Sequence, residues 1–203
     1  MYRLYGAPGT ASLAVHWMLI ELGVPFEFVT VDTGAGEQKS ADYLALNPEG
    51  RVPAMIVDGA PRTESTALLM LLAERHPEAG FEPERGAAER PLYLQTMVQL
   101  ANGLMPPFRA WFYPEEGLPQ DVSRARIEAV WDRMDALLSD GRAFVLGERI
   151  SAADFLLTML TRWSRNMPRP ATAWPHLGAY VVRMKQRPGL IEVHAREGLT
   201  EWI

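Results

Sequence analysis

The sequence contains no cysteine. Disulfide bonds, thiolate catalysis and CxxC redox chemistry are therefore excluded for this chain. Histidines are few, and their positions lack the spacing typical of metal ligands; they are His16, His76, His176 and His194. We interpret each histidine as structural or solvated, and we expect no metal cofactor.

Long apolar runs are also missing. No segment approaches the roughly 20 apolar residues of a membrane-spanning helix. The N-terminal residues run at once into a glycine-proline turn at 6–9, which is unlike a secretory signal peptide. The net charge of −5 and the isoelectric point near 5.4 give no electrostatic footprint for nucleic acid. We therefore expect a cytoplasmic protein without a nucleic-acid or membrane partner.

The segment 1–80 alternates between strand and helix patterns. A strand at 2–5 precedes a helix that begins near Thr10 or Ser12, both competent N-cap residues, and stops at Gly23. The remaining expected elements are a strand at 26–31, a helix at 40–46, a strand at 54–57, an edge strand at 60–62 and a helix at 65–75. Parallel strands joined by helices, with a terminal hairpin at Asp58-Gly59, predict a small α/β domain.

The character of the sequence changes after this domain. Residues 81–86 have the composition of a linker, and the segment 87–203 contains no convincing strand. Helix patterns occupy 88–112, 121–140, 153–164, 175–186 and 189–196. Long helices with short turns predict an all-α bundle. Within it Ser151 and Asp154 have the spacing of a capping box, which explains both residues structurally.

Two features in the first domain indicate a binding site. The peptide bond before Pro53 is a candidate for the cis form, because cis costs little free energy at an X–Pro bond. A cis bond would leave the backbone N–H and C=O of Val52 free to pair with an extended peptide. Glu64 and Ser65 open a helix, where free N–H groups attract a carboxylate and Glu64 can pair with an ammonium group. The alternatives are a rigid turn before a core strand and ordinary helix capping.

The motif NPEGRVPAMIVDG followed by TESTALL, the turn YGAPGTAS and the box ISAADF together resemble the cytosolic glutathione S-transferases of the bacterial type. The resemblance covers essentially the whole chain. It implies a thioredoxin-like α/β domain at 1–80, a linker at 81–86 and an all-α domain at 87–203. It also implies a homodimer that uses glutathione as co-substrate.

The resemblance assigns ligand groups to the binding residues. Val52, before Pro53, would pair with the cysteinyl backbone of glutathione, and Glu64 and Ser65 would hold its γ-glutamyl end. The residues that flank this region and could hold the glycyl carboxylate are Gln38, Lys39 and Arg51.

Catalysis in this family depends on lowering the thiol pKa of bound glutathione. A hydroxyl that donates a hydrogen bond to the sulfur lowers this pKa, because it stabilises the thiolate. Thr10 stands at the position of the catalytic serine in P-x-S members. The cysteine of the bacterial P-G-x-C-S pattern is replaced by Ala11, which leaves hydroxyl activation. Thr10 is the first candidate, Ser12 the second and Tyr5 the third. Simple capping of the first helix by Thr10 and Ser12 is the alternative.

The second substrate would contact the helical domain. The last turns of the first helix in this domain are rich in aromatic residues. Their side chains could line an apolar cleft for a hydrophobic electrophile, or form the bundle core. They are Met105, Phe108, Trp111, Phe112 and Tyr113, with Asn102 one turn earlier; Trp202 could cover the cleft or pack down.

Three functions remain open from the sequence. The first is a transferase that conjugates glutathione to hydrophobic electrophiles. The second is another glutathione-dependent activity, as an isomerase, dehalogenase or peroxidase. The third is a binding protein that keeps the fold without catalysis. It stays open because the cysteine is absent and Thr10 replaces a serine: the extra methyl group of threonine restricts χ1 and could misdirect the hydroxyl.

Overall fold

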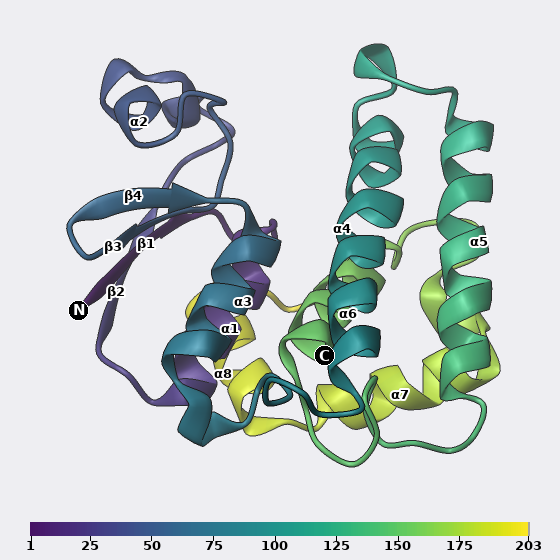
Figure 1. The fold of residues 1–203 in the computed structure, drawn as a ribbon. Helices are drawn as coiled ribbons and strands as arrows, with labels where there is room; N and C mark the ends of the chain where they lie inside the picture. The colour runs from purple at the N-terminus through teal and green to yellow at the C-terminus, as the bar shows by residue number, and fades with distance from the viewer. Residues whose placement is uncertain (203) are drawn as a thin grey trace. The chain divides into compact units, whose positions relative to one another are not determined.

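The computed structural model describes residues 1–202, apart from the side chain of residue 116. The chain forms two compact units, which we describe separately (Figure 1). The first comprises residues 1–79 and 187–201, and the second residues 80–186 with Trp202. No helix within 1–202 has both the length and the apolar character needed to cross a membrane.

The first unit is built on a mixed sheet with the strand order β2-β1-β3-β4. Its strands are β1 (Tyr2–Gly6), β2 (Phe26–Thr30), β3 (Ala54–Val57) and β4 (Ala60–Thr63). The pair β1 and β2 is parallel, as a crossover through a helix requires, and β3 runs antiparallel to both β1 and β4. Asp58 and Gly59 both have positive φ, at 53° and 77°, and make the tight hairpin turn that the sequence predicts.

The helices of the first unit come from both ends of the chain. They are α1 (Ser12–Leu22), α2 (Ala41–Leu46), α3 (Ser65–Arg75) and α8 (Pro188–Arg196), with 3-10 turns η1 (Glu37–Lys39) and η2 (Pro77–Ala79). Every residue of α1 from Ser12 to Leu19 is buried, because this helix packs against β1, α3 and α8. A methyl group at Gly6 would collide with Ser12 and Phe28, so Gly6 allows α1 to begin close to the sheet.

The start of α1 corrects one prediction. The helix begins at Ser12, as expected, but its N-cap residue is Ala11 and no side chain caps it. The hydroxyls of Thr10 and Ser12 instead turn back to the carbonyl oxygen of Ala7, at 2.7 and 3.0 Å. Neither Thr10 nor Ser12 is therefore the N-cap residue, because that position falls on Ala11; the Thr10 oxygen accepts from the N–H of Ser12, at 3.4 Å.

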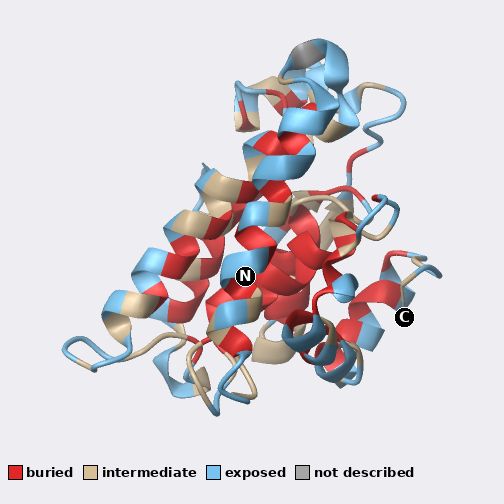
Figure 2. Ribbon diagram, turned by 90° about the vertical axis from the view of Figure 1, so that its right-hand side faces the viewer, coloured by how far each residue is buried: buried red, intermediate tan, exposed pale blue. Residues whose placement is uncertain are grey.

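The second unit is helical. Its helices are α4 (Arg90–Phe112), α5 (Gln120–Leu138), α6 (Ala152–Trp163) and α7 (Pro175–Lys185), with 3-10 turns η3 (Pro114–Glu116) and η4 (Ala171–Ala173). All residues of α6 from Ala152 to Arg162 are buried, and α4 and α7 pack against it. Buried residues fill the interior while the outward faces of the long helices are exposed (Figure 2). The fold class predicted from the sequence, an α/β domain followed by a helical bundle, is confirmed.

The predicted capping box starts α6. The backbone N–H of Ser151 donates to the Asp154 carboxylate at 2.8 Å, and the N–H of Val145 donates to its other oxygen at 2.9 Å. Tyr180 of α7 also donates to Asp154, at 3.2 Å. The carboxyl is fully buried, and this desolvation raises the pKa of Asp154 to about 6. Asp154 therefore holds the entry to α6 and its packing on α7.

Candidate functional site

The sheet register brings the predicted binding segments to one end of the first unit. Ala54 of β3 is paired with Tyr5 of β1 on one side and with Thr63 of β4 on the other. The residues just beyond this rung are Gly6 on β1, Pro53 before β3 and Glu64 after β4. The loop before α1, the Val52-Pro53 peptide and the start of α3 therefore converge at the same end of the sheet.

The peptide bond between Val52 and Pro53 is cis, as predicted. Val52 lies past the last rung of the ladder, and its backbone groups form no hydrogen bond with any residue within 1–202. Both groups are thus available to an extended ligand, in the manner of an added strand.

A buried asparagine fixes the turn that presents Val52. Asn47 is 4% exposed; its amide donates to the carbonyl of Arg51 at 2.6 Å, and its side-chain oxygen accepts from the N–H of Glu49 at 3.1 Å. The hydroxyl of Tyr43 donates to the same Arg51 carbonyl at 2.8 Å. Sequence reasoning did not assign this role to Asn47, although an asparagine that opens an N-P-x-G turn is a usable signal.

The start of α3 has an unusual backbone. Glu64 is an exposed residue with φ of 66°, a conformation rare for a residue with a side chain, and no side chain caps the helix. The backbone N–H groups of Ser65, Thr66 and Ala67 have no partner in the described part of the chain. Ser65 is 3% exposed, and its hydroxyl is likewise unpaired there. This end of α3 therefore offers several donors to an anion.

The loop before α1 holds the candidate catalytic hydroxyls. The oxygens of Thr10 and Ser12 lie 3.0 Å apart. Thr10 is partly exposed, whereas Ser12 is fully buried and also accepts from the N–H of Ala7 at 3.2 Å. Side chains alternate along a strand, so Tyr5 lies on the opposite face of the sheet from Gly6, which contacts Ser12. The structure thus brings Thr10 and Ser12 together, and Tyr5 packs on Tyr43 instead.

The same loop is tied to α8. The N–H of Gly9 donates to a carboxylate oxygen of Glu197 at 2.8 Å, and the other oxygen lies 2.8 Å from Nδ1 of His16. The His16 ring is stacked on Phe28, with 4.2 Å between ring centroids. Glu197 is separated from Gly9 by most of the chain, so no local sequence signal identifies this contact.

The residues predicted to hold a glycyl carboxylate differ in their availability. The ammonium of Lys39 donates to the carbonyl of Glu49 at 3.2 Å, and the amide of Gln38 donates to Thr33 at 3.3 Å. Arg51 is exposed, and its guanidinium has no ion-pair or hydrogen-bond partner within the described residues. Arg51 is therefore the cation here that can reach an anion without first losing a partner.

In the second unit, the candidate electrophile residues divide into core and surface. Phe108 is fully buried, and its ring lies 5.7 Å from Trp163 and 5.9 Å from Phe112. Phe108 thus follows the bundle-core alternative: it supports Phe112 from within the core and presents no surface of its own. The exposed members are Phe112, Tyr113 and Asn102, and the half-buried ones are Met105 and Trp111. The ammonium of Lys185 lies over the ring of Trp202, 5.3 Å from the ring centroid.

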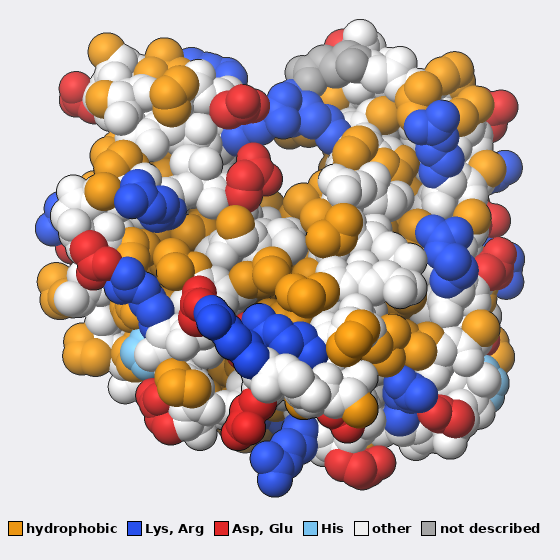
Figure 3. All heavy atoms as spheres, in the orientation of Figure 1, with side chains coloured by type: hydrophobic (Ala, Val, Ile, Leu, Met, Phe, Trp, Pro, Cys, Tyr) orange, Lys and Arg blue, Asp and Glu red, His pale blue; other side chains and the backbone are white. Residues whose placement is uncertain are grey.

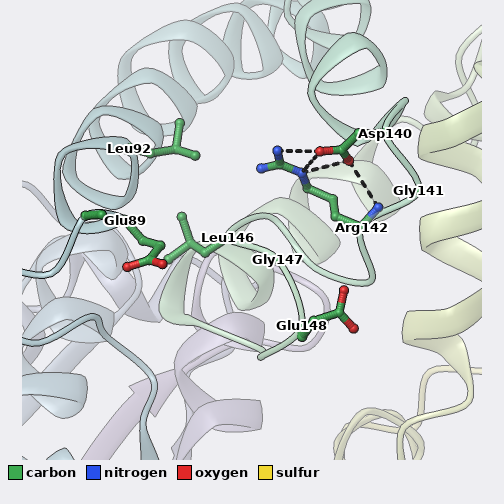
Figure 4. Close-up of a pocket in the computed structure, with 9 residues that line it drawn as sticks. Glu89, Leu92, Asp140, Gly141, Arg142, Leu146, Gly147 and Glu148 are labelled. Carbon is green, nitrogen blue, oxygen red and sulfur yellow. Dashed lines mark hydrogen bonds and ion pairs between the residues drawn. The ribbon is translucent and has the colours of Figure 1, made fainter.

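An open cavity of about 490 Å³ lies elsewhere in the second unit. Figure 4 shows Asp140 bonded to Arg142 at its edge, with the carboxylates of Glu89 and Glu148 around it. The hydrogen bond from Arg142 lowers the pKa of Asp140 to about 2. No residue predicted for the site lines this cavity. Across residues 1–202, no group of three or more His, Cys, Asp or Glu side chains could hold a metal ion.

Comparison with known proteins connects both units to one family. Residues 1–74 match the model of the glutathione S-transferase N-terminal domain, and residues 87–203 match that of the C-terminal domain. The chain is 29% identical over 202 residues to the glutathione S-transferase GstA of Escherichia coli O157:H7, covering 97% of this chain and 99% of that one.

Solved structures of glutathione transferases resemble this chain over nearly its full length. A glutathione transferase from Methylococcus capsulatus has a TM-score of 0.89 at 31% identity, over 98% of this chain and 100% of its own. A sphingomonad glutathione S-transferase complexed with glutathione has a TM-score of 0.83 at 32% identity, with the same two coverages. Because family models match both parts of the chain and these relatives span nearly all of it, the protein belongs to the glutathione S-transferase family.

Proposed function

We propose that the protein binds glutathione at the end of the sheet in its first unit and transfers its thiolate to hydrophobic electrophiles. Glutathione transferase activity is the function of the family to which the chain belongs. The observation that carries the proposed site is the set of unpaired donors at the start of α3, beside the free backbone of Val52.

Each end of glutathione has a complementary group in this arrangement. The α-carboxylate of the γ-glutamyl end would accept from the N–H groups and hydroxyl at Ser65, and its ammonium would pair with the exposed Glu64. The cysteinyl backbone would pair with Val52 beside Pro53. Arg51, with Lys39 and Gln38 nearby, would attract the glycyl carboxylate.

The thiol of a ligand held in this way would be activated by the loop before α1. Ser12 is buried and cannot touch a ligand, whereas the Thr10 hydroxyl is partly exposed. We therefore assign the hydrogen bond to the sulfur to Thr10, assisted by the positive end of α1. Tyr5 is the weaker candidate, because it packs on Tyr43 on the other face of the sheet.

The electrophile would contact the second unit through its exposed aromatic side chains. Phe112 is 46% exposed and is held from beneath by Phe108 and Trp163, so it offers a fixed apolar surface. We assign the electrophile site to Phe112 and Tyr113, with Met105, Trp111 and Asn102 around them.

The wider setting is proposed on the family's pattern. A glutathione-binding domain at 1–80, a linker at 81–86 and a helical domain at 87–203 would assemble as a homodimer in the cytoplasm. Analytical ultracentrifugation would give the oligomeric state, and a mass near twice 22.7 kDa is expected.

A thiolate titration tests the function directly. Ultraviolet absorbance of the glutathione complex is followed against pH, and conjugation to an activated aryl halide is measured in parallel. A thiol pKa well below that of free glutathione, with turnover, supports a transferase. Saturable binding with an unchanged thiol pKa and no turnover would instead identify a non-catalytic binding protein. Activation without aryl transfer would direct the search to isomerase, dehalogenase or peroxidase substrates.

A further inference from the structure

The carbonyl oxygen of Ala7 has more donors than it can fully use. It receives the backbone N–H of Thr10 at 3.2 Å, the hydroxyl of Thr10 at 2.7 Å and the hydroxyl of Ser12 at 3.0 Å. A carbonyl oxygen has two lone pairs, so one of the three donors is surplus. The structure therefore contains a hydroxyl proton that can leave Ala7 without stranding a buried acceptor.

Burial decides which proton can leave. Ser12 is fully buried, and a methyl group on Gly6 would come within 2.5 Å of its oxygen. Its hydroxyl can donate only to Ala7 or to the Thr10 oxygen 3.0 Å away. Thr10 is partly exposed, so its proton is the one that can turn outward.

We propose that Ser12 is a positioning residue that releases the Thr10 hydroxyl for the glutathione sulfur, by taking its place on the carbonyl of Ala7. This inference rests on the proposed function. Before release, Thr10 donates to Ala7 and Ser12 donates to the Thr10 oxygen. After release, Ser12 donates to Ala7 and Thr10 donates to the thiolate, while the N–H of Ala7 stays on Ser12 throughout.

The step involves no covalent change in the protein. The glutathione thiol loses its proton to solvent, and the two hydroxyl protons change acceptors. Without the Ser12 hydroxyl, release of Thr10 would leave the Ala7 carbonyl with only the N–H of Thr10, at 3.2 Å. The hydrogen bond lost at Ala7 would then offset part of the stabilisation that Thr10 gives to the thiolate. The ionisable groups bonded to this loop are Glu197, on the N–H of Gly9, and His16 beyond it.

A double-mutant cycle on the bound thiol tests the proposal. The thiol pKa of bound glutathione is measured by ultraviolet absorbance in the unmodified protein, Thr10→Val, Ser12→Ala and the double variant, with the dissociation constant measured alongside. Ser12→Ala should raise that pKa by about 0.5 to 1, corresponding to one net hydrogen bond. In the Thr10→Val background it should change nothing further, since no hydroxyl remains to be released.

Ser123→Ala is the matched control. Ser123 is also fully buried, its hydroxyl has no partner among the described residues, and it lies in the second unit. It should leave the thiol pKa unchanged. Equal effects of Ser12→Ala in both Thr10 backgrounds, or no effect in either, would overturn the positioning role while leaving the proposed function intact. Failure of the unmodified protein to bind glutathione would instead overturn the proposed function.

A measurement on the unmodified protein covers the case in which Ser12→Ala does not fold. The carbonyl carbon of Ala7, followed by nuclear magnetic resonance in the glutathione complex, should shift with the same midpoint as the thiolate absorbance, because its donors exchange. In Thr10→Val that shift should disappear. An Ala7 carbonyl that is insensitive to thiol ionisation would refute the exchange.

Discussion

Nδ1 of His16 lies 2.8 Å from the carboxylate of Glu197, and both side chains are buried. The other Glu197 oxygen accepts from the N–H of Gly9, so this carboxylate joins α1 and the end of α8 to the loop that carries Thr10. Residues far apart in the sequence thus share one buried acceptor. Removing that acceptor would take a buried hydrogen-bond partner from the His16 ring and the carboxylate contact from the N–H of Gly9.

Glu197→Ala should therefore destabilise the protein by about 1–3 kcal/mol, because the buried His16 ring loses its hydrogen-bond partner. Urea unfolding measures the change. Glu192→Ala is the matched control, because Glu192 on α8 pairs with Arg196 in an exposed i,i+4 ion pair. Its loss should cost less than about 0.5 kcal/mol. Similar costs for the two variants would show that the buried pair does not anchor the loop.

The start of α3 gives a prediction on binding. Ser65→Ala removes a hydroxyl from the proposed carboxylate site and should weaken glutathione binding about tenfold, as for one hydrogen bond to a charged group. Glu64→Gln should weaken it similarly, through the ammonium. Isothermal titration calorimetry measures both.

Thr33→Ala is the control for these variants, since Thr33 is exposed and only its backbone carbonyl is used, by Gln38. Unchanged glutathione affinity in both Ser65→Ala and Glu64→Gln would exclude the start of α3 as the binding site. The melting temperatures of the three variants should agree closely, because the altered side chains make no hydrogen bond within the described residues.

The sequence predicted most of the elements because local signals agree with the fold. Gly23 ends α1, Asp58-Gly59 turns the hairpin and the Ser151–Asp154 spacing starts α6. The cis bond before Pro53 was also predictable, since only an X–Pro bond adopts it cheaply.

The details of the site depended on tertiary structure. Neither Thr10 nor Ser12 is the N-cap residue of α1, because that position falls on Ala11, and both hydroxyls donate to the carbonyl of Ala7. The contact of Glu197 with Gly9 has no local pattern, because it depends on where α8 packs. Phe108 and Phe112 differ in burial although both are apolar residues on one helix.

Asp154 makes stability depend on pH. Its pKa in the folded protein, about 6, lies above the value near 4 of an unfolded chain, so the folded state binds the extra proton between these values. Protonation of Asp154 therefore contributes about 3 kcal/mol to the free energy of unfolding. This contribution is fully present below pH 4 and is lost as the pH rises through 6.

Asp154→Asn should remove this slope between pH 4 and 6. It should also lower stability at pH 7 by about 1–3 kcal/mol, because an amide cannot accept from both Val145 and Ser151. Denaturant unfolding at several pH values measures both effects. A variant with the slope of the unmodified protein would show that another group titrates in this range.

Phe112 separates electrophile recognition from glutathione binding. Phe112 is 46% exposed, yet its ring stacks on Phe108 and packs edge-on against Trp163, so its exposed surface is held in place. Phe112→Ala should lower kcat/KM for an aryl electrophile about tenfold, through lost apolar contact, and leave the glutathione dissociation constant unchanged. Val98→Ala, on the same helix and 54% exposed, is the control and should alter neither. If Phe112→Ala left kcat/KM at the level of the control, the electrophile site would have to lie on other residues, with Tyr113 and Met105 the next to test.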